Sequence, residues 1–257
     1  MGFAPEWLAL REPADRAARD AALLARAVAL ADGAVLDLGC GTGSTLRAFA
    51  GERATGAGWR LFDHDADLLA RAAAWHPEAV IHQGDLARVE DLPLEGVGLV
   101  TASALFDLVS RAWVERFAAR LAGAGTALYA ALSYDGVMRW HPEDPDDAIV
   151  TMRFNAHQRG DKGFGPALGP EAAEVTTAVF EALGYEVHYA PSPWRLGPQD
   201  AEMQRLLLAG IAQAAGEAGF AGAEAWHGRR AQVLADGWAE IGHIDLLALP
   251  PGLVQRA

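Results

Sequence analysis

Short apolar runs and amphipathic segments alternate along the first half of the chain. The apolar runs stop at aspartate or glycine and are typical of buried parallel strands. These predicted strands are Ala34–Leu38, Trp59–Phe62, Ala79–His82, Val97–Ala102 and Thr126–Leu132. Between them, apolar residues recur at helical spacing. The predicted helices are 12–31, Ser44–Ala50, 66–75 and a segment that begins after Ser110. Such alternation predicts βαβ units and a doubly wound α/β sheet with helices on both faces.

Several residues mark where the predicted helices begin. Pro13 suits the first turn of the N-terminal helix, because proline lacks the N–H that a first turn leaves unpaired. Asp65 and Ser110 precede helical segments, and their side chains can accept hydrogen bonds from the first free N–H groups.

The second half is less regular. Residues 133–169 hold no clear core element, and a loop of this length is usually functional or disordered. Further elements follow it in order. They are a helix from Pro170 to Gly184, a strand Tyr185–Tyr189, a helix from Pro198, a helical stretch over 223–235 and a strand Ile241–Leu249. No linker divides the chain, so we expect one domain over 1–257.

Composition narrows the function classes. The net charge of −13 disfavours nucleic-acid binding, which needs clustered Lys and Arg. Cys40 is the one cysteine, so no internal disulfide can form and no metal site is expected. The sequence contains no apolar run of membrane-spanning length and no recognisable secretory signal. We therefore expect a cytoplasmic protein without a membrane partner.

The turn after the first strand reads Asp37-Leu38-Gly39-Cys40-Gly41-Thr42-Gly43. Its glycines let the backbone approach a ligand closely, and the following helix presents free N–H groups. A dinucleotide site would have a glycine at the position of Ser44. The turn therefore departs from the dinucleotide pattern.

The charge of Asp37 distinguishes two kinds of cofactor. A carboxylate beside a pyrophosphate would cost roughly 4 kcal/mol at about 4 Å and an effective dielectric near 20. S-adenosylmethionine (SAM) carries an ammonium and a sulfonium, which an acidic turn attracts. The turn therefore favours SAM.

The motif VLDLGCGTG resembles the first motif of class I SAM-dependent methyltransferases. Three further segments resemble that family's later motifs in the same order, LFDHD, HQGDLA and LVTASALFD. The resemblance covers residues 33–132, the expected cofactor-binding half. It implies a mostly parallel seven-stranded sheet, with the last strand antiparallel between the fifth and sixth. Apart from the resemblance, the polar character of residues 133–169 suggests an acceptor-side insertion or lid.

The resemblance also implies roles for single residues. Asp63 would bind the ribose hydroxyls and His64 would lie against the adenine. Asp85 would accept a hydrogen bond from the adenine amino group, near the backbone of Leu86. The backbones of Gly39 and Ser103 would line the methionine moiety.

Two departures from the family pattern concern the acceptor. The segment after the fourth strand lacks the (D/N)PP(Y/F) signature, which weighs against methylation of nucleobases or glutamine. Residues 133–169 match no acceptor-binding pattern. We therefore expect a small-molecule acceptor, with S-adenosylhomocysteine (SAH) as the other product.

A base is needed only if the acceptor is protonated. His141 and Tyr134 are the candidates, with Asp107 as the residue that orients them. A cationic stretch suggests an anionic acceptor or, alternatively, surface charge paired with nearby aspartates. It comprises His141, Arg153, His157, Arg159 and Lys162, and the aspartates are Asp144, Asp146, Asp147 and Asp161.

Two rival functions share the cofactor. One is an enzyme that transfers or cyclises the aminocarboxypropyl arm of SAM and releases methylthioadenosine. The other is a SAM-binding regulatory subunit without turnover. The sequence does not decide between a monomer and a homodimer.

Overall fold

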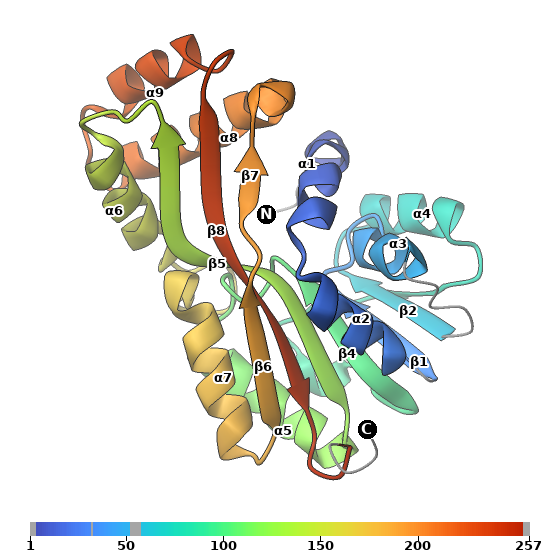
Figure 1. Ribbon diagram of the computed structural model, residues 1–257. Helices are drawn as coiled ribbons and strands as arrows, with labels where there is room; N and C mark the ends of the chain where they lie inside the picture. The colour runs from blue at the N-terminus through green and yellow to red at the C-terminus, as the bar shows by residue number, and fades with distance from the viewer. Residues whose placement is uncertain (1–3, 32, 52–57, 254–257) are drawn as a thin grey trace.

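The computed structural model describes residues 4–31, 33–51 and 58–253, and these ranges form a twisted sheet flanked by helices (Figure 1). In this part of the chain the sheet has eight strands in the order β3-β2-β1-β4-β5-β8-β6, with β7 paired to β8. Strands β1 to β5 pair in parallel, and β8 runs antiparallel to both β5 and β6. The doubly wound sheet and the antiparallel strand between the fifth and sixth are thus confirmed.

The strands are β1 (Ala34–Leu38), β2 (Gly58–Asp63), β3 (Val80–Gln83), β4 (Val97–Ser103), β5 (Ala127–His141), β6 (Glu186–Pro191), β7 (Trp194–Leu196) and β8 (Trp238–Leu249). The α-helices are α1 (Pro5–Ala18), α2 (Ala21–Ala29), α3 (Ser44–Gly51), α4 (Ala66–Trp75), α5 (Arg111–Ala124), α6 (Asp147–Gln158), α7 (Ala172–Ala182), α8 (Ala201–Glu217) and α9 (Ala223–Gln232). Short 3-10 turns lie at Val89–Asp91, Gly169–Glu171 and Pro198–Asp200. In the described ranges, no helix combines the length and the apolar character that crossing a membrane requires.

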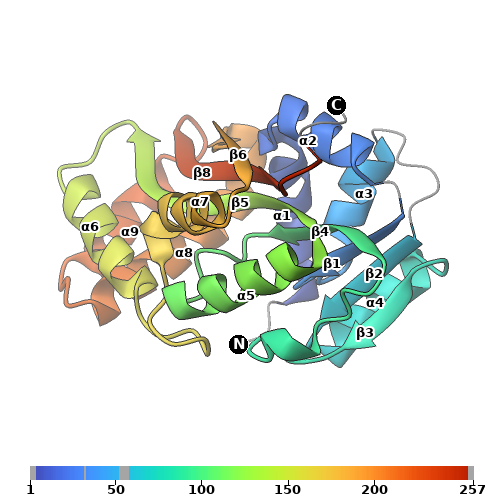
Figure 2. The ribbon, with the colours of Figure 1, turned by 90° about the horizontal axis from the view of Figure 1, so that it is seen from below.

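Helices cover both faces of the sheet (Figure 2). On one face, Leu24 of α2, Phe49 of α3 and Leu69 of α4 pack against β1, β2 and β4. On the other face, Phe117 of α5 and Phe180 of α7 pack against β4, β5 and β8. The core therefore consists of two apolar layers with the sheet between them.

Side chains cap the helices where the sequence predicts it. Asp65 accepts hydrogen bonds from the N–H groups of Asp67 and Leu68 at the start of α4. Ser110 accepts one from Trp113 at the start of α5, and Gly125 ends that helix with φ 66°. These caps confirm two of the predicted helix starts.

The predicted helix 12–31 is wrong in its start and its continuity. Helix α1 begins at Pro5, and Pro13 lies inside it. Helix α1 ends before Arg19, and Asp20 caps the start of α2 by accepting a hydrogen bond from Leu23 N at 2.8 Å. An aspartate at this position stabilises a new helix start, which explains the break.

The prediction that the fifth strand ends at Leu132 is also wrong. β5 continues to His141 after a bend at Leu132, whose φ is 57°. Its second half pairs with β8 from Tyr134↔His243 to His141↔Trp238. Residues 133–169 are therefore not a loop, because β5 and α6 occupy much of that segment.

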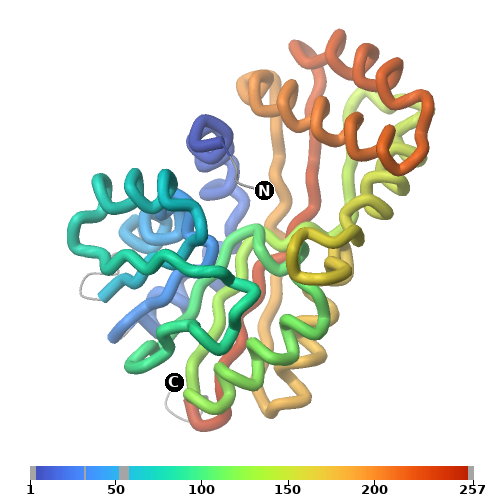
Figure 3. The backbone as a smooth tube through the Cα atoms, turned by 180° about the vertical axis from the view of Figure 1, so that it is seen from behind, coloured from blue at the N-terminus to red at the C-terminus, as the bar shows by residue number. Residues whose placement is uncertain are grey.

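We call the second half of β5 and the first half of β8, together with β7, α6, α8 and α9, the extension. Its apolar cluster includes Met138, Trp140, Leu208, Trp226 and Ile241, and Trp7 and Leu10 of α1 pack against it. From behind, α8 and α9 lie over the strands of the extension (Figure 3). The extension thus continues the sheet beyond the edge at which the parallel strands end.

Candidate functional site

The turn between β1 and α3 has a backbone that only glycines adopt without strain. Gly39, Gly41 and Gly43 have φ of 61°, 53° and 86°. The N–H of Gly41 donates to Asp63 Oδ2 at 2.9 Å. A Cβ on Gly43 would lie 2.9 Å from His76 Cδ2, and one on Gly41 would lie 3.1 Å from Leu8 Cδ1. The predicted turn therefore requires glycine at these positions, both for its backbone angles and for the close packing of His76 and Leu8.

Asp37 lies directly before this turn and is 1% exposed. Its Oδ1 accepts a hydrogen bond from Thr101 Oγ1 at 2.7 Å. Its Oδ2 is buried and finds no hydrogen-bond partner among the described residues. Burial raises the pKa of Asp37 to about 7, although Thr101 and the charge of Arg19 act in the opposite direction. The carboxyl is thus divided between its two protonation states near neutral pH, whereas the sequence argument assumed a full charge.

Arg19, at the break between α1 and α2, is a site residue that the sequence reasoning missed. Its side chain is buried, and Nη2 donates to Ser103 Oγ at 3.1 Å. Within the described ranges, Nη1 has no hydrogen-bond partner. A buried guanidinium and a buried carboxyl, each with one polar atom unpaired among the described residues, thus lie near the ends of β4 and β1. Nothing in the sequence distinguishes Arg19 from the other arginines of the N-terminal segment.

Asp63 ends β2 and is 5% exposed. In addition to Gly41, it binds the N–H of Asp65 through Oδ1 at 3.0 Å. His64 Nδ1 lies 3.2 Å from the same oxygen, and 60% of the His64 side chain is exposed. Because a carboxylate has about four lone-pair positions, Asp63 supports the turn and keeps capacity for further donors.

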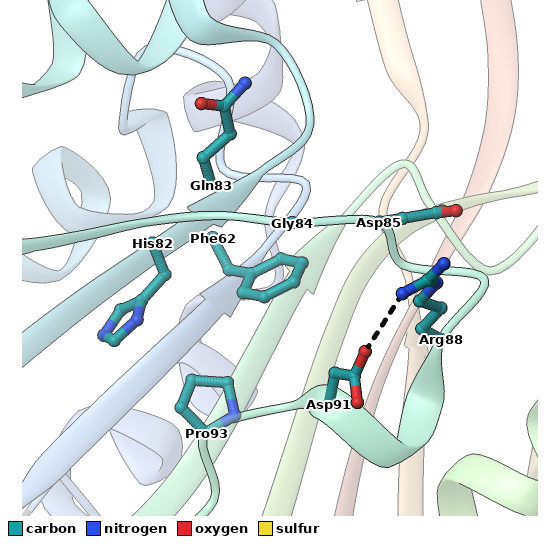
Figure 4. Close-up of a pocket in the computed structure, with 8 residues that line it drawn as sticks. All are labelled: Phe62, His82, Gln83, Gly84, Asp85, Arg88, Asp91 and Pro93. Atoms are coloured by element: carbon teal, nitrogen blue, oxygen red, sulfur yellow. Dashed lines mark ion pairs between the residues drawn. The ribbon is translucent and has the colours of Figure 1, made fainter.

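Asp85 is exposed, and its Oδ1 accepts from Ala87 N at 2.9 Å. The neighbouring Leu86 is buried, and its carbonyl accepts from Trp113 Nε1 at 2.7 Å. Asp85 also lines a cavity of about 420 Å³ (Figure 4). The other lining residues are Phe62, His82, Gln83, Gly84, Arg88, Asp91 and Pro93. This cavity therefore adjoins the predicted adenine end, and the glycine turn is not part of its lining.

Two non-glycine residues adopt left-handed backbone conformations at the same sheet edge. Ala104 follows β4 with φ 51°, and Leu132 in β5 has φ 57°. They lie side by side, since Ala104 N donates to Ala131 O at 2.9 Å. Such conformations cost about 1–3 kcal/mol each and cluster at functional sites. This edge, beside Ser103, is therefore a candidate reaction centre.

Asp107 and Tyr134 come together near this edge. A buried Asp107 oxygen, Oδ1, has no hydrogen-bond partner in the described part of the chain. Burial raises the pKa of Asp107 to about 6, against the opposing effect of backbone N–H groups and of Arg11 and Lys162. The hydroxyl of Tyr134 donates to Asn155 Oδ1 at 2.7 Å, and burial raises its pKa well above the usual range. Within the described residues Asp107 thus keeps one buried oxygen without a partner, whereas the Tyr134 hydroxyl is already hydrogen-bonded.

His141 lies elsewhere. It is seven residues beyond Tyr134 on β5, which corresponds to roughly 20 Å of extended strand. Its ring is exposed and stacks on Trp238 at a centroid distance of 5.9 Å. The structure therefore brings together only two of the three predicted catalytic residues.

Two residues of the cationic stretch pair with glutamates. His157 Nε2 lies 2.9 Å from Glu217, and Arg159 lies 2.9 Å from Glu171. The aspartates expected to pair with the stretch bind α9 instead: Asp144 and Asp146 contact Arg229, and Asp147 contacts Arg230. The predicted pairing with these three aspartates is therefore wrong.

His243 is a second residue that the sequence reasoning missed, because it lies within a predicted strand. It is paired with Tyr134 across β5 and β8, and its ring centroid is 4.7 Å from that of Trp194. Burial, assisted by the charge of Arg11, lowers the pKa of His243 to about 3, so the ring is neutral at pH 7. Its buried Nδ1 has no hydrogen-bond partner within the residues described.

Comparisons with known proteins give structural matches only. No family model matches the chain. No curated protein matches its sequence. The YcgJ protein from Bacillus subtilis is 15% identical with a TM-score of 0.52, and the match covers 91% of this chain and 100% of that chain.

Two further solved structures match less closely. An O-methyltransferase family protein from Burkholderia thailandensis is 16% identical with a TM-score of 0.48, over 70% of this chain and 52% of that chain. Human N-acetylserotonin methyltransferase, solved in complex with SAM, is 14% identical with a TM-score of 0.46, over 72% of this chain and 49% of that chain. Together with the strand order, the similarity to YcgJ shows that this chain shares the doubly wound, mostly parallel fold of that protein.

Proposed function

We propose that this protein binds SAM at the glycine turn and transfers its methyl group to a small-molecule acceptor. The observation that carries the proposal is the pair of buried, incompletely bonded groups beside the turn. In the described ranges, Asp37 Oδ2 and Arg19 Nη1 have no hydrogen-bond partner. An amino acid moiety carries an ammonium and a carboxylate, which complement an acidic and a basic group. Buried polar atoms without partners are costly, so a ligand that supplies partners is favoured.

The remaining predicted residues fit the other parts of SAM. Asp63 has lone pairs left for ribose hydroxyls, and Asp85 is exposed beside its cavity. His64 is exposed next to Asp63, where it could contact the adenine. Gly39 follows β1 and Ser103 ends the neighbouring β4, so both would contribute backbone groups to the methionine moiety.

When bound, SAM supplies a methyl group on a sulfonium, which is an already activated leaving group. The protein must therefore align the acceptor and exclude water, and such positioning contributes up to roughly 7–11 kcal/mol. The bend at Leu132 and the loop after β4 form the sheet edge at which this alignment would take place.

We propose that Asp107 acts as the general base that accepts the proton of a hydroxyl or amine acceptor. Among the described residues, its buried Oδ1 has no hydrogen-bond partner, and its pKa of about 6 leaves it ionised at neutral pH. The wild-type rate should fall below pH 6, where the carboxyl becomes protonated. Asp107→Asn should lower the rate of SAH formation by about 100-fold, in the range of general base catalysis, while SAM affinity stays within about twofold.

The Asp107 assignment is tested by measuring SAH by mass spectrometry with a pooled extract of small molecules as the acceptor source. A rate in Asp107→Asn equal to that of the wild type would rule out Asp107. Tyr134→Phe is the comparison variant. Because the Tyr134 hydroxyl already donates to Asn155, its removal should lower the rate of SAH formation less than Asp107→Asn does.

Calorimetry tests the function as a whole. SAM and SAH should bind, whereas NADH should not, because NADH has no ammonium that could pair with the buried Asp37 carboxyl. Tight binding of NADH without binding of SAM would overturn the proposal. Mass spectrometry of the spent cofactor then separates the rivals: SAH indicates methyl transfer and methylthioadenosine indicates transfer of the aminocarboxypropyl arm. Tight SAM binding without turnover on any extract would indicate a regulatory subunit.

A further inference from the structure

Helix α1 lies against the glycine turn. The Leu8 side chain is 3.1 Å from the position that a Cβ on Gly41 would occupy. Trp7 and Leu10 of the same helix pack against the apolar cluster of the extension. α1 therefore touches both the turn and the extension, and Figure 1 shows it between β7 and α3.

Arg47 of α3 holds the turn from the other side. Its Nη1 donates to the carbonyl of Thr42 at 2.5 Å, and its Nη2 donates to Thr42 Oγ1 at 3.2 Å. Thr42 lies between Gly41 and Gly43 and is buried. Because Arg47 binds the carbonyl of this residue, it fixes the orientation of the peptide unit between Thr42 and Gly43.

Glu12 of α1 orients Arg47. The two side chains form a bidentate pair, with Nε donating to Oε1 at 2.7 Å and Nη2 donating to Oε2 at 2.6 Å. The side chains of Arg47 and Glu12 are only 20% and 19% exposed, so solvent screens the pair less than a surface ion pair. The hydrogen bond from Arg47 lowers the pKa of Glu12 from its ordinary value.

We propose that Glu12 and Arg47 are positioning residues for the cofactor, and that they hold the glycine turn in its binding shape through Thr42. This inference rests on the proposed function. Neither residue needs to touch SAM. A turn that is already fixed loses less conformational freedom on binding, so releasing it should weaken affinity.

The design of the test depends on what else holds α1. Trp194 Nε1 of β7 donates to Asp15 Oδ1 at 2.9 Å, and Arg11 forms a buried pair with Asp15 at 2.9 Å. Helix α1 therefore stays attached when Glu12 is replaced. A matched control lies on the same helix, since Glu6 pairs with Arg71 of α4 at 3.9 Å in an exposed position away from the turn.

The experiment measures SAM dissociation constants by calorimetry for Glu12→Gln, Arg47→Gln, the double variant and the control Glu6→Gln. Each replacement of Glu12 or Arg47 should weaken SAM binding by about tenfold, within the range of coupling between contacting residues. The double variant should lose no more SAM affinity than the single variant that binds SAM less tightly. Arg47→Lys should recover part of the affinity, because lysine restores a charge beside Glu12 and one donor to Thr42.

Thermal unfolding of each variant separates this role from general destabilisation. The proposal requires that Glu12→Gln lose affinity at a temperature at which it is fully folded, while Glu6→Gln keeps the wild-type affinity. SAM binding by Arg47→Gln and Glu12→Gln within twofold of the wild type would overturn it, and so would independent, multiplying losses in the double variant. A wild-type protein that does not bind SAM would instead refute the proposed function.

Discussion

Asp37 has one hydrogen-bonded oxygen and, within the described residues, one without a partner, both shielded from solvent. Its environment therefore favours the neutral carboxyl until a cation arrives. A ligand ammonium beside Oδ2 would favour the ionised form and lower the pKa again. Binding of the cofactor and loss of this proton are thus linked.

We expect SAM affinity to fall as the pH decreases below about 7, where Asp37 becomes protonated. The loss should approach about tenfold per pH unit at most, because each bound SAM must displace one proton. Calorimetry between pH 5.5 and 8.5 measures this dependence, and Asp37→Asn should remove it while weakening binding at pH 8.

The control for the Asp37 prediction is Asp67→Asn, which makes the same charge change at an exposed position of α4. Stability provides a second check. The pKa of Asp37 is raised in the folded state, so ionisation between about pH 4 and pH 7 destabilises the protein. Asp37→Asn should therefore be at least as stable as the wild type at pH 8. A pH-independent affinity in the wild type would contradict the linkage.

Sequence reasoning finds the site residues that belong to a local pattern and misses those that do not. Asp37 and the three glycines are adjacent in sequence, so their spacing carries the signal. Arg19 bonds Ser103, 84 residues away. His243 faces Tyr134 only because β8 pairs with β5. No local spacing records contacts of this kind.

At the level of elements, Asp245 of β8 holds the bend of β5. It is fully buried, and its carboxylate accepts hydrogen bonds from Leu132 N at 2.8 Å, Tyr129 Oη at 3.0 Å and Asp20 N at 3.0 Å. One residue thus fixes the left-handed bend and the start of α2. The sequence could not predict the longer strand, because Ser133, Asp135 and Gly136 are typical of loops and the pairing with β8 overrides that preference.

We predict that Asp245→Ala destabilises the protein by roughly 3 kcal/mol or more, because three donors lose their acceptor in a buried position. Tyr129→Phe removes only one of these bonds and should cost about 1 kcal/mol. Chemical denaturation followed by circular dichroism measures both values. Equal costs for the two variants would mean that Asp245 does not hold the bend through Leu132 and Asp20.

At the level of the whole molecule, the parallel half of the sheet could be predicted and the extension could not. Strands β1, β2 and β4 are short, mostly buried runs, each followed by an α-helix, so the local sequence indicates the structure. β3 is partly exposed and leads only into a short 3-10 turn. The extension is built from β5, β7 and β8, together with helices that are separated in the chain. The apolar residues of α8 and α9 indicate helices, but not the surface against which they pack.

The bend at Leu132 divides β5 into two parts that should tolerate mutation differently. Before the bend, residues 127–131 of β5 lie between neighbouring strands and are covered by helices on both faces, so replacements there disturb the whole sheet. After the bend, the same strand packs with α6, α8 and α9, which lie apart from the glycine turn. Under the proposed function, mutation of these three helices would change the acceptor preference and leave SAM binding at the glycine turn intact.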